Sequence, residues 1–286
     1  MRASNPKPDL GPNTPFLRVG TALTGAAWGL FLVLIWQMTL FQALRMDPRL
    51  GAGWMVLVTV ALLFVYAWAP SRRRARARLR VRSPGRAWPW LLAMVPAFAL
   101  LPQALWVALL AFGLAHEPEA YKPVEDFIAR PFGEPAFWFL AILAAPLLEE
   151  FGFRGWVQRP LERGFGAMPA IAASAALFAF AHADPEQFPV LLAGGLVLGN
   201  AVYASRSVWS GVVLHVSWNL AAFALDLFAR DVEVAGKGWT WGAPAAGVAA
   251  VCLVWCAWLV RRMQDAAAPR PRRARLTPAA AGPSPD

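Results

Sequence analysis

The sequence predicts an all-α fold, a polytopic transmembrane helical bundle with about eight spans and both termini in the cytoplasm. The chain has 286 residues, of which 58% are hydrophobic and 15% charged, and its mean hydropathy is +0.45. A soluble domain of this length would lack enough polar side chains to cover so much apolar surface. The apolar residues also come in blocks close to 20 residues long, enough to cross a hydrocarbon core of roughly 30 Å.

Eight such blocks are candidate spans, and each is apolar along almost its whole length. They occupy about 19–44, 51–69, 87–114, 136–153, 166–183, 188–205, 207–228 and 239–260. The first block is too long for the apolar part of a cleavable signal peptide and lacks a convincing small-residue cleavage site. We therefore expect it to be a true spanning helix.

Lysine and arginine are distributed unequally between alternate loops. Twenty-one of them fall on the side of the two termini, including eight in the loop 70–86, and six fall on the other side. Cytoplasmic loops of membrane proteins carry the excess of positive charge. We therefore expect cytoplasmic termini, and we interpret the net charge of +10 as a topology signal and not as a nucleic-acid-binding surface.

Composition divides the chain into five segments. The polar, proline-rich residues 1–15 and the Ala/Pro/Arg-rich residues 264–286 are predicted to be disordered tails. The first three spans and the basic loop occupy 16–135, the helices that carry polar groups occupy 136–228, and the last span lies within 229–263.

Ionisable groups inside spans are energetically costly, so each of them is a functional candidate. Glu149 and Glu150 lie near the end of the fourth apolar block, and Arg154 follows four residues after Glu150. On a helix, Glu150 and Arg154 share a face and can pair, whereas Glu149 points about 100° away. A buried carboxylate without such a partner can accept and return a proton. An ordinary ion pair at a helix end explains this segment equally well.

Two later spans carry the remaining candidates. His182 ends the stretch Phe178-Ala179-Phe180-Ala181-His182, and taken alone it is typical of a polar residue at the membrane interface. His215 and Asn219 are four residues apart in an apolar helix, so they point the same way, which by itself favours a hydrogen bond to another helix. Because three spans bring groups suited to acid–base chemistry, we expect these helices to converge on one cavity.

The ordered motifs resemble those of the CPBP family, which comprises the CAAX-prenyl-protease and bacteriocin-processing (Abi) proteins. The resemblance covers about 136–228 and rests on Glu149-Glu150-x-x-x-Arg154, Phe178-x-x-x-His182 and His215-x-x-x-Asn219. It implies an intramembrane endopeptidase that hydrolyses a peptide bond in a membrane-associated or C-terminally anchored protein.

The resemblance also implies a role for each motif residue. Glu149 would be the general base that activates water, and His182 would help to position that water. His215 and Asn219 would donate hydrogen bonds to the oxyanion. The remaining motif residues, Glu150 and Arg154, would orient the site.

The sequence leaves a metal alternative open. Zinc could be held by Glu149, His182 and His215. Asn219 is a poor zinc ligand, and the family is usually described as glutamate-dependent, so we favour a mechanism without a metal or other cofactor. The chain has no His-Glu-x-x-His, Gly-x-Ser-Gly or Gly-x-Gly-Asp motif, which disfavours the other classes of intramembrane protease.

Two further functions compete with proteolysis. One is a catalytically silent scaffold or immunity-type protein of the same family, and the other is a proton-coupled transporter, which the absence of a visible repeat disfavours. The expected partners are the lipid bilayer and a protein or peptide substrate. The arginine-rich, lysine-poor composition favours a bacterial inner (plasma) membrane.

The predicted span edges create a geometric difficulty. A fourth span that ends at 153 places Glu149 near the cytoplasmic end, whereas a fifth span that ends at 183 places His182 near the outer end. These two groups could not meet. Either the fourth helix continues to about Arg163 and places Glu149 at mid-depth, or the fifth span is tilted or its edges are misplaced. We expect the long fourth helix, with Arg154 inside the membrane or just at its edge.

Overall fold

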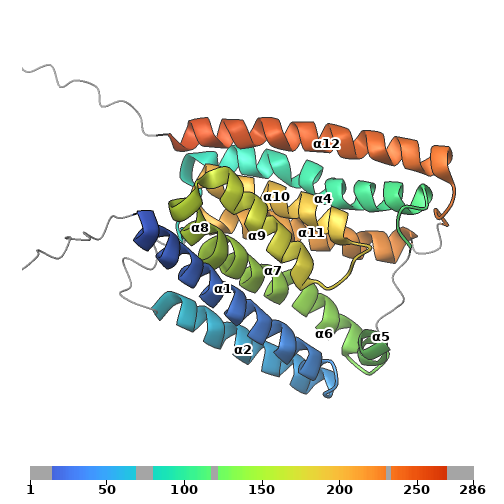
Figure 1. Ribbon diagram of the computed structural model, residues 1–286. Coiled ribbons are helices and arrows are strands. Elements are labelled where there is room, and N and C mark those ends of the chain that lie inside the picture. The colour runs from blue at the N-terminus through green and yellow to red at the C-terminus, as the bar shows by residue number, and fades with distance from the viewer. Residues whose placement is uncertain (1–14, 69–79, 117–121, 230–232, 269–286) are drawn as a thin grey trace, which may run out of the picture.

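The computed structural model describes residues 15–68, 80–116, 122–229 and 233–268, and it contains helices and no strands in these ranges (Figure 1). The predicted all-α fold is therefore confirmed. A helix lies in each of the eight predicted ranges. Outside the fourth range these helices are α1 (Pro15–Ala43), α2 (Pro48–Trp68), α4 (Trp88–Ala111), α9 (Ala167–Ala181), α10 (Phe188–Ser205), α11 (Val208–Ala229) and α12 (Gly238–Ala267).

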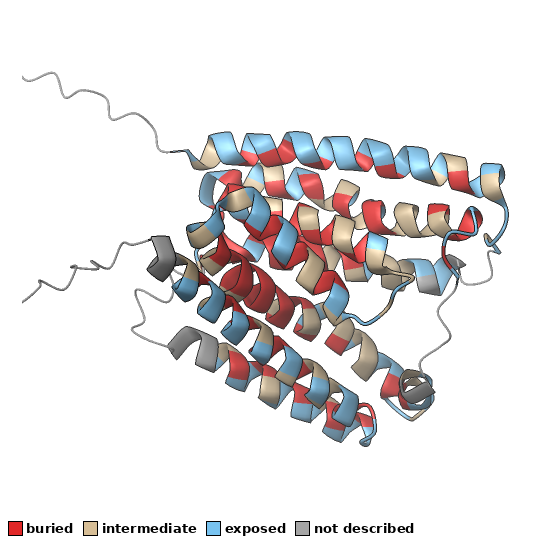
Figure 2. Ribbon diagram, in the orientation of Figure 1, coloured by how far each residue is buried: buried red, intermediate tan, exposed pale blue. Residues whose placement is uncertain are grey.

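Six of the described helical stretches are long and apolar enough to cross a membrane. They are Val19–Ala43, Gly85–Ala111, Gly133–Phe165, Phe188–Ser205, Val208–Leu225 and Gly238–Ala267, while Pro48–Phe64 and Ala167–Ala181 are shorter. Figure 2 shows the buried residues on the inner faces of the bundle and a largely exposed α12. Because Val251 and Val254 on α12 are each 70% exposed, the outer surface is apolar, as an integral membrane protein requires. The number of crossings and the orientation of the termini stay predictions.

The fourth range forms one long, continuous helical stretch, Gly133–Phe165, of 33 residues. Its segments are α6 (Gly133–Phe139), η2 (Leu140–Ala144), α7 (Ala145–Glu149), η3 (Glu150–Gln158) and α8 (Arg159–Phe165), of which η2 and η3 are π-helical. The expectation of a long fourth helix is confirmed, and the predicted edge at 153 is wrong. That edge rested on charged residues, which the structure pairs with one another inside the bundle.

A tight turn at Gly166 folds α9 back along this helix. Gly166 has a φ of +87°, which suits glycine because it has no Cβ. Glu149 lies sixteen residues before Phe165 and His182 lies fifteen residues after Ala167. At about 1.5 Å per residue both are therefore roughly 22–24 Å from the turn. The shared depth removes the geometric difficulty, because α9 ends level with Glu149, although His182 is exposed there.

The connections add short helices that composition did not predict. α5 (Lys122–Ile128) precedes the long helix, and the 3₁₀ turn η1 (Gly85–Ala87) precedes α4. α12 continues to Ala267, so the first residues of the predicted C-terminal tail are helical. The rest of that tail, residues 1–14 and the loop segment 69–79 lie outside the described residues. The first turn of α1, which begins at Pro15, and the last turn of α12, which ends at Ala267, lie at the same end of the bundle, on the left of Figure 1.

Small residues allow α10 to approach its neighbours closely. A Cβ added at Gly195 would lie 3.1 Å from the side chain of Ala175 on α9, and one at Gly199 would lie 2.8 Å from Oε1 of Gln158 on η3. The sequence places these two glycines one helical turn apart, a pattern that lets helices pack tightly in membranes. α10 therefore packs against both arms of the helical hairpin, α9 and the long helix that contains η3.

Candidate active site

Glu149 and Glu150 lie at the centre of the long helix, where its hydrogen-bond register changes. α7 ends at Glu149 and the π-helical segment η3 begins at Glu150. π-helical turns are rare and are frequent at functional sites. Both glutamates are buried, with exposed fractions of 5% and 0%, so their charges must be met by groups inside the protein.

Glu150 is surrounded by cationic and hydrogen-bonding groups. Nη1 of Arg154 lies 2.9 Å from its Oε1, an ion pair at an angle outside that of a hydrogen bond. Nδ1 of His215 lies 3.0 Å from the same oxygen. Gly211 lies directly beside the carboxylate, so close that an added Cβ would collide with Oε2. The predicted pairing of Glu150 with Arg154 is confirmed.

Arg154 is held in place by two further contacts. Its Nη2 donates a hydrogen bond of 3.2 Å to the carbonyl oxygen of Gly195 on α10. Its guanidinium also lies 4.6 Å from the centre of the Phe178 ring. With 1% exposure, Arg154 lies inside the bundle and not in the cytoplasmic loop where the predicted span edge placed it.

Glu149 has a different environment from its neighbour. Its nearest polar contact among the described residues is His215, whose Nε2 lies 3.9 Å from Oε2, beyond hydrogen-bond distance. One imidazole therefore lies between the two carboxylates, bonded to Glu150 through one nitrogen and facing Glu149 with the other.

His182 joins this group through Phe178. It follows the last residue of α9, and its Nδ1 lies 2.8 Å from the carbonyl oxygen of Phe178. The Phe178 ring is 4.7 Å from the ring of His182 and 5.6 Å from that of His215, centre to centre. Phe178 is thus the apolar residue around which both histidines and the arginine are packed.

Asn219 lies one helical turn beyond His215 on α11, as the i, i+4 spacing predicts. Its Nδ2 donates a hydrogen bond of 2.7 Å to the carbonyl oxygen of Ala141 in η2. This contact fixes the plane of the amide and leaves the second Nδ2 hydrogen unassigned. Between the two histidine-bearing helices, the ring of Trp218 fills the space beside Gly194, where a Cβ would overlap it.

The described residues do not form the ligand set that the zinc alternative requires. Among the described residues, no three His, Cys, Asp or Glu side chains are placed to share one metal ion. Of the three proposed ligands, His215 directs Nδ1 at Glu150 and holds Nε2 3.9 Å from Glu149, while His182 is bonded to its own helix. These donors do not fit a tetrahedral zinc site, whose ligands lie about 2 Å from the ion.

Sequence reasoning missed a row of polar residues that extends from the site to the end of the long helix. Gln158 and Glu162 continue the four-residue spacing of Glu150 and Arg154. Nε2 of Gln158 donates 3.0 Å hydrogen bonds to the carbonyl oxygen of Gly199 and to Oε1 of Glu162. The four-residue spacing of these polar residues is visible in the sequence and could have predicted the row.

The fold and site define a polytopic helical membrane protein in which α7–η3 and α11 bring buried acid–base groups together, and His182 follows α9 at a similar depth. Residues 131–221 match the family model of type II CAAX prenyl endopeptidases, described as Rce1-like. This range contains all six predicted site residues. This match supports the resemblance to the CPBP family of CAAX-type intramembrane proteases that the sequence motifs predicted. No match was found among curated proteins or among solved structures.

Proposed function

We propose that the chain is an intramembrane endopeptidase in which Glu149 activates the water that attacks a peptide bond. The observation that carries the proposal is the unequal environment of two adjacent buried carboxylates. Glu150 contacts Arg154 at 2.9 Å and His215 at 3.0 Å, whereas the nearest polar contact of Glu149 is His215 at 3.9 Å. A carboxylate that is paired with a guanidinium and hydrogen-bonded to an imidazole is a poor base, so we infer that Glu149 is the one available for proton transfer.

The contacts of His215 favour an imidazole ring in which both nitrogens donate hydrogen bonds. Glu150, paired with Arg154, is placed to accept a hydrogen bond from Nδ1 of His215. In the neutral ring, Nε2 would then present a lone pair towards the carboxylate of Glu149. A proton on Nε2 removes this repulsion and creates a hydrogen-bond donor. With a hydrogen on Nε2, the ring could donate to an oxyanion.

The contacts of His182 favour an accepting ring. The carbonyl oxygen of Phe178 can only accept, so Nδ1 of His182 carries the hydrogen in this 2.8 Å contact. In the neutral ring Nε2 is then a free acceptor. It can receive a hydrogen bond from the attacking water and orient the water's oxygen towards the substrate.

The proposed reaction has two steps. Glu149 takes a proton from water as the oxygen attacks the carbonyl carbon, and the carbonyl oxygen becomes an oxyanion that receives hydrogen bonds from His215 and Asn219. The same proton then passes from Glu149 to the amide nitrogen as the carbon–nitrogen bond breaks. The products are a carboxylic acid and an amine, and Glu149 returns to its ionised form. No step requires a metal or other cofactor.

The site's depth supports a substrate that enters from the bilayer. Glu149 is the seventeenth of the 33 residues in the spanning stretch Gly133–Phe165, so the chemistry takes place near mid-membrane. We propose a membrane-associated or C-terminally anchored protein as the substrate and a bacterial inner membrane as the location.

Comparative proteomics of membranes from cells that carry the wild-type chain or Glu149→Gln tests this proposal. Glutamine keeps the size of the side chain but cannot accept the proton, so uncleaved precursors should accumulate. Glu134→Gln is the matched control, because Glu134 is exposed in the first turn of α6. If Glu149→Gln leaves every precursor at its wild-type level while a partner protein is still bound, the chain is a binding protein and not an enzyme.

A further inference from the structure

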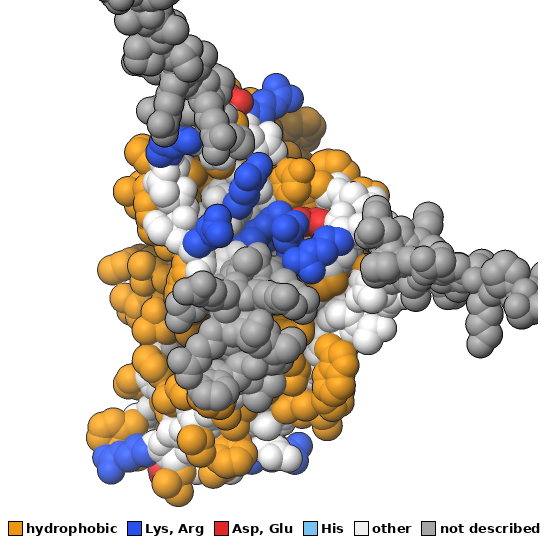
Figure 3. Space-filling model, turned by 90° about the vertical axis from the view of Figure 1, so that its left-hand side faces the viewer, with side chains coloured by type: hydrophobic (Ala, Val, Ile, Leu, Met, Phe, Trp, Pro, Cys, Tyr) orange, Lys and Arg blue, Asp and Glu red, His pale blue; other side chains and the backbone are white. Residues whose placement is uncertain are grey.

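An arginine-lined cleft lies at the end of the bundle that carries Pro15 and Ala267. Its volume is about 780 Å³, and the polar side chains that line it are Arg80, Arg82, Arg159, Tyr203, Arg206 and Gln264. Figure 3 shows several basic side chains gathered on this end of the molecule. The charge distribution predicts that this end faces the cytoplasm.

The cleft carries more positive than negative charge. Glu162 neutralises part of the positive charge. Its Oε2 lies 2.7 Å from Nη2 of Arg80 and 2.9 Å from Nη1 of Arg159. Arg82 and Arg206 are exposed and have no carboxylate partner among the described residues. Four guanidinium groups therefore face one carboxylate, which leaves three positive charges in excess.

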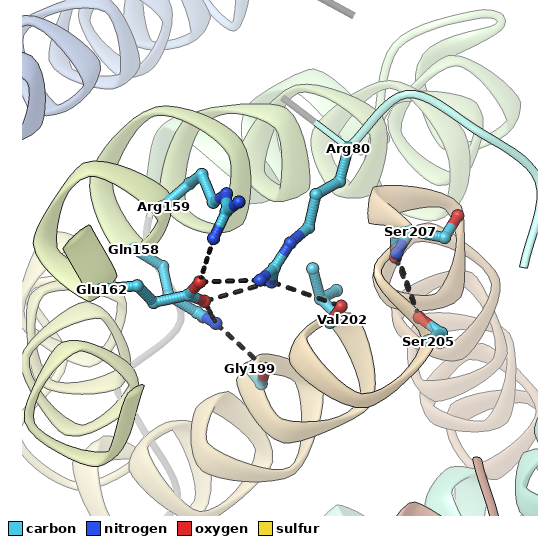
Figure 4. Close-up of polar contacts among 8 residues, drawn as sticks. All are labelled: Arg80, Gln158, Arg159, Glu162, Gly199, Val202, Ser205 and Ser207. Carbon is cyan, nitrogen blue, oxygen red and sulfur yellow. Dashed lines mark hydrogen bonds and ion pairs between the residues drawn. The ribbon is translucent and has the colours of Figure 1, made fainter. Parts of the chain in front are cut away.

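The Arg80 side chain is buried in the cleft and is held in place by hydrogen bonds. It is 7% exposed, and its two terminal nitrogens donate hydrogen bonds to the two carboxylate oxygens of Glu162 (Figure 4). Nη1 also donates to the carbonyl oxygen of Val202 at 3.4 Å. Burial lowers the pKa of Arg80, the charge of Glu162 opposes this effect, and the charge of Arg159 adds to it. A second anion would favour the charged form further.

The backbone around the cleft is fixed by several hydrogen bonds. The amide of Val208 donates to the carbonyl oxygen of Arg80, and the hydroxyl of Ser207 donates to that of Arg82. The turn between α10 and α11, which carries Arg206, is closed by a 3.2 Å bond from the amide of Ser207 to Oγ of Ser205 (Figure 4). Arg80 and Arg206 have φ values of +55° and +56°. Residues other than glycine keep this conformation where the surrounding structure holds it.

One buried donor in the cleft lacks a partner. Nε of Arg159 is shielded from solvent and has no hydrogen-bond acceptor, although Nη1 of the same side chain pairs with Glu162. Guanidinium groups match the oxygen atoms of phosphate in geometry and charge. A phosphate group would supply acceptors to this nitrogen and to the exposed guanidinium groups of Arg82 and Arg206.

We propose that this cleft binds a phosphate group, supplied by the headgroup of an anionic phospholipid. The ends of three helices support the lipid as the source, because α8 ends at Phe165, α10 ends at Ser205 and α11 begins at Val208. These ends lie where spanning helices leave the hydrocarbon core and meet the headgroups. Basic clusters at this level attract anionic lipids.

The test measures lipid retention by the full-length chain. The protein is placed in nanodiscs of phosphatidylcholine that contain increasing phosphatidylglycerol, and native mass spectrometry counts the lipids that stay bound. The variant Arg82→Gln/Arg206→Gln removes the two unpaired charges. Because both side chains are exposed, folding should be unchanged, and thermal unfolding checks this. Arg261→Gln/Arg262→Gln removes the same charge from the same end outside the cleft.

We expect the wild type to retain phosphatidylglycerol selectively. The cleft variant should weaken this retention by about tenfold, as expected for the loss of charge-assisted hydrogen bonds, and the control variant should retain it. If glycerol phosphate or inorganic phosphate binds to the wild type in pure phosphatidylcholine and not to the cleft variant, the cleft binds phosphate as proposed. The source of the phosphate is then a soluble molecule and not a lipid headgroup. No selectivity in the wild type, or equal losses in both double variants, would overturn the proposal.

Discussion

The ion pair between Glu150 and Arg154 allows a quantitative test of how the site is held together. Both side chains are 0% exposed, and Arg154 also bonds to the carbonyl oxygen of Gly195. Replacing Arg154 with methionine leaves a buried carboxylate whose remaining hydrogen-bond partner is His215. Breaking a buried pair in this way costs about 3–5 kcal/mol of unfolding free energy. Glu150→Gln, which leaves the guanidinium without its anion, should cost a similar amount.

The double variant Glu150→Gln/Arg154→Met separates coupling from two independent losses. Independent contributions would sum to roughly 6–10 kcal/mol. We expect the double variant to be no less stable than the worse single variant, because no uncompensated charge stays buried. Equilibrium unfolding in mixed detergent micelles, followed by circular dichroism, measures all three, with Glu134→Gln as the control. Additive losses would refute the view that the two charges act as one unit.

Three further predictions concern activity. Gly211→Ala should lower kcat/KM by about 10²-fold, because the new Cβ displaces Glu150, whereas Gly247→Ala, which meets nothing within 4 Å, should leave peptidase activity unchanged. Asn219→Ala should lower kcat by roughly 10²–10³-fold through loss of an oxyanion donor, and a loss of stability without a loss of kcat would restrict this residue to its bond with Ala141. Chelators should leave peptide cleavage in detergent unchanged, and activity that is lost and then restored by zinc would refute the metal-free mechanism.

The sequence predicted two local arrangements on helix faces better than it predicted the edge of the fourth span. Spacing placed Glu150 beside Arg154 and His215 beside Asn219 on shared helix faces, and the structure has both arrangements. Hydropathy ended the fourth span at 153 because a sum over residues counts each charge as a cost. This sum takes no account of partners. Burying two opposite charges as a pair costs less than burying each of them alone.

Long-range pairing explains what the sequence could not predict. Arg80 and Glu162 are 82 residues apart in the chain, so no local pattern connects them. The row from Glu150 to Glu162 was visible as spacing, but Gln158 gains meaning only from the carbonyl oxygen of Gly199 on another helix. The packing of Phe178 between two histidines likewise depends on where α9 and α11 meet.

The hairpin around Gly166 has a consequence for how such a protein adapts to its substrates. Its two arms carry Glu149 and His182 at matching distances from the turn, so in the proposed mechanism the length of the arms sets the depth at which the peptide bond is cut. Deleting one residue from a single arm would shift one group by about 1.5 Å and rotate it by about 100° relative to the other. In that mechanism, a cut at another depth would require both arms to change together, in whole helical turns.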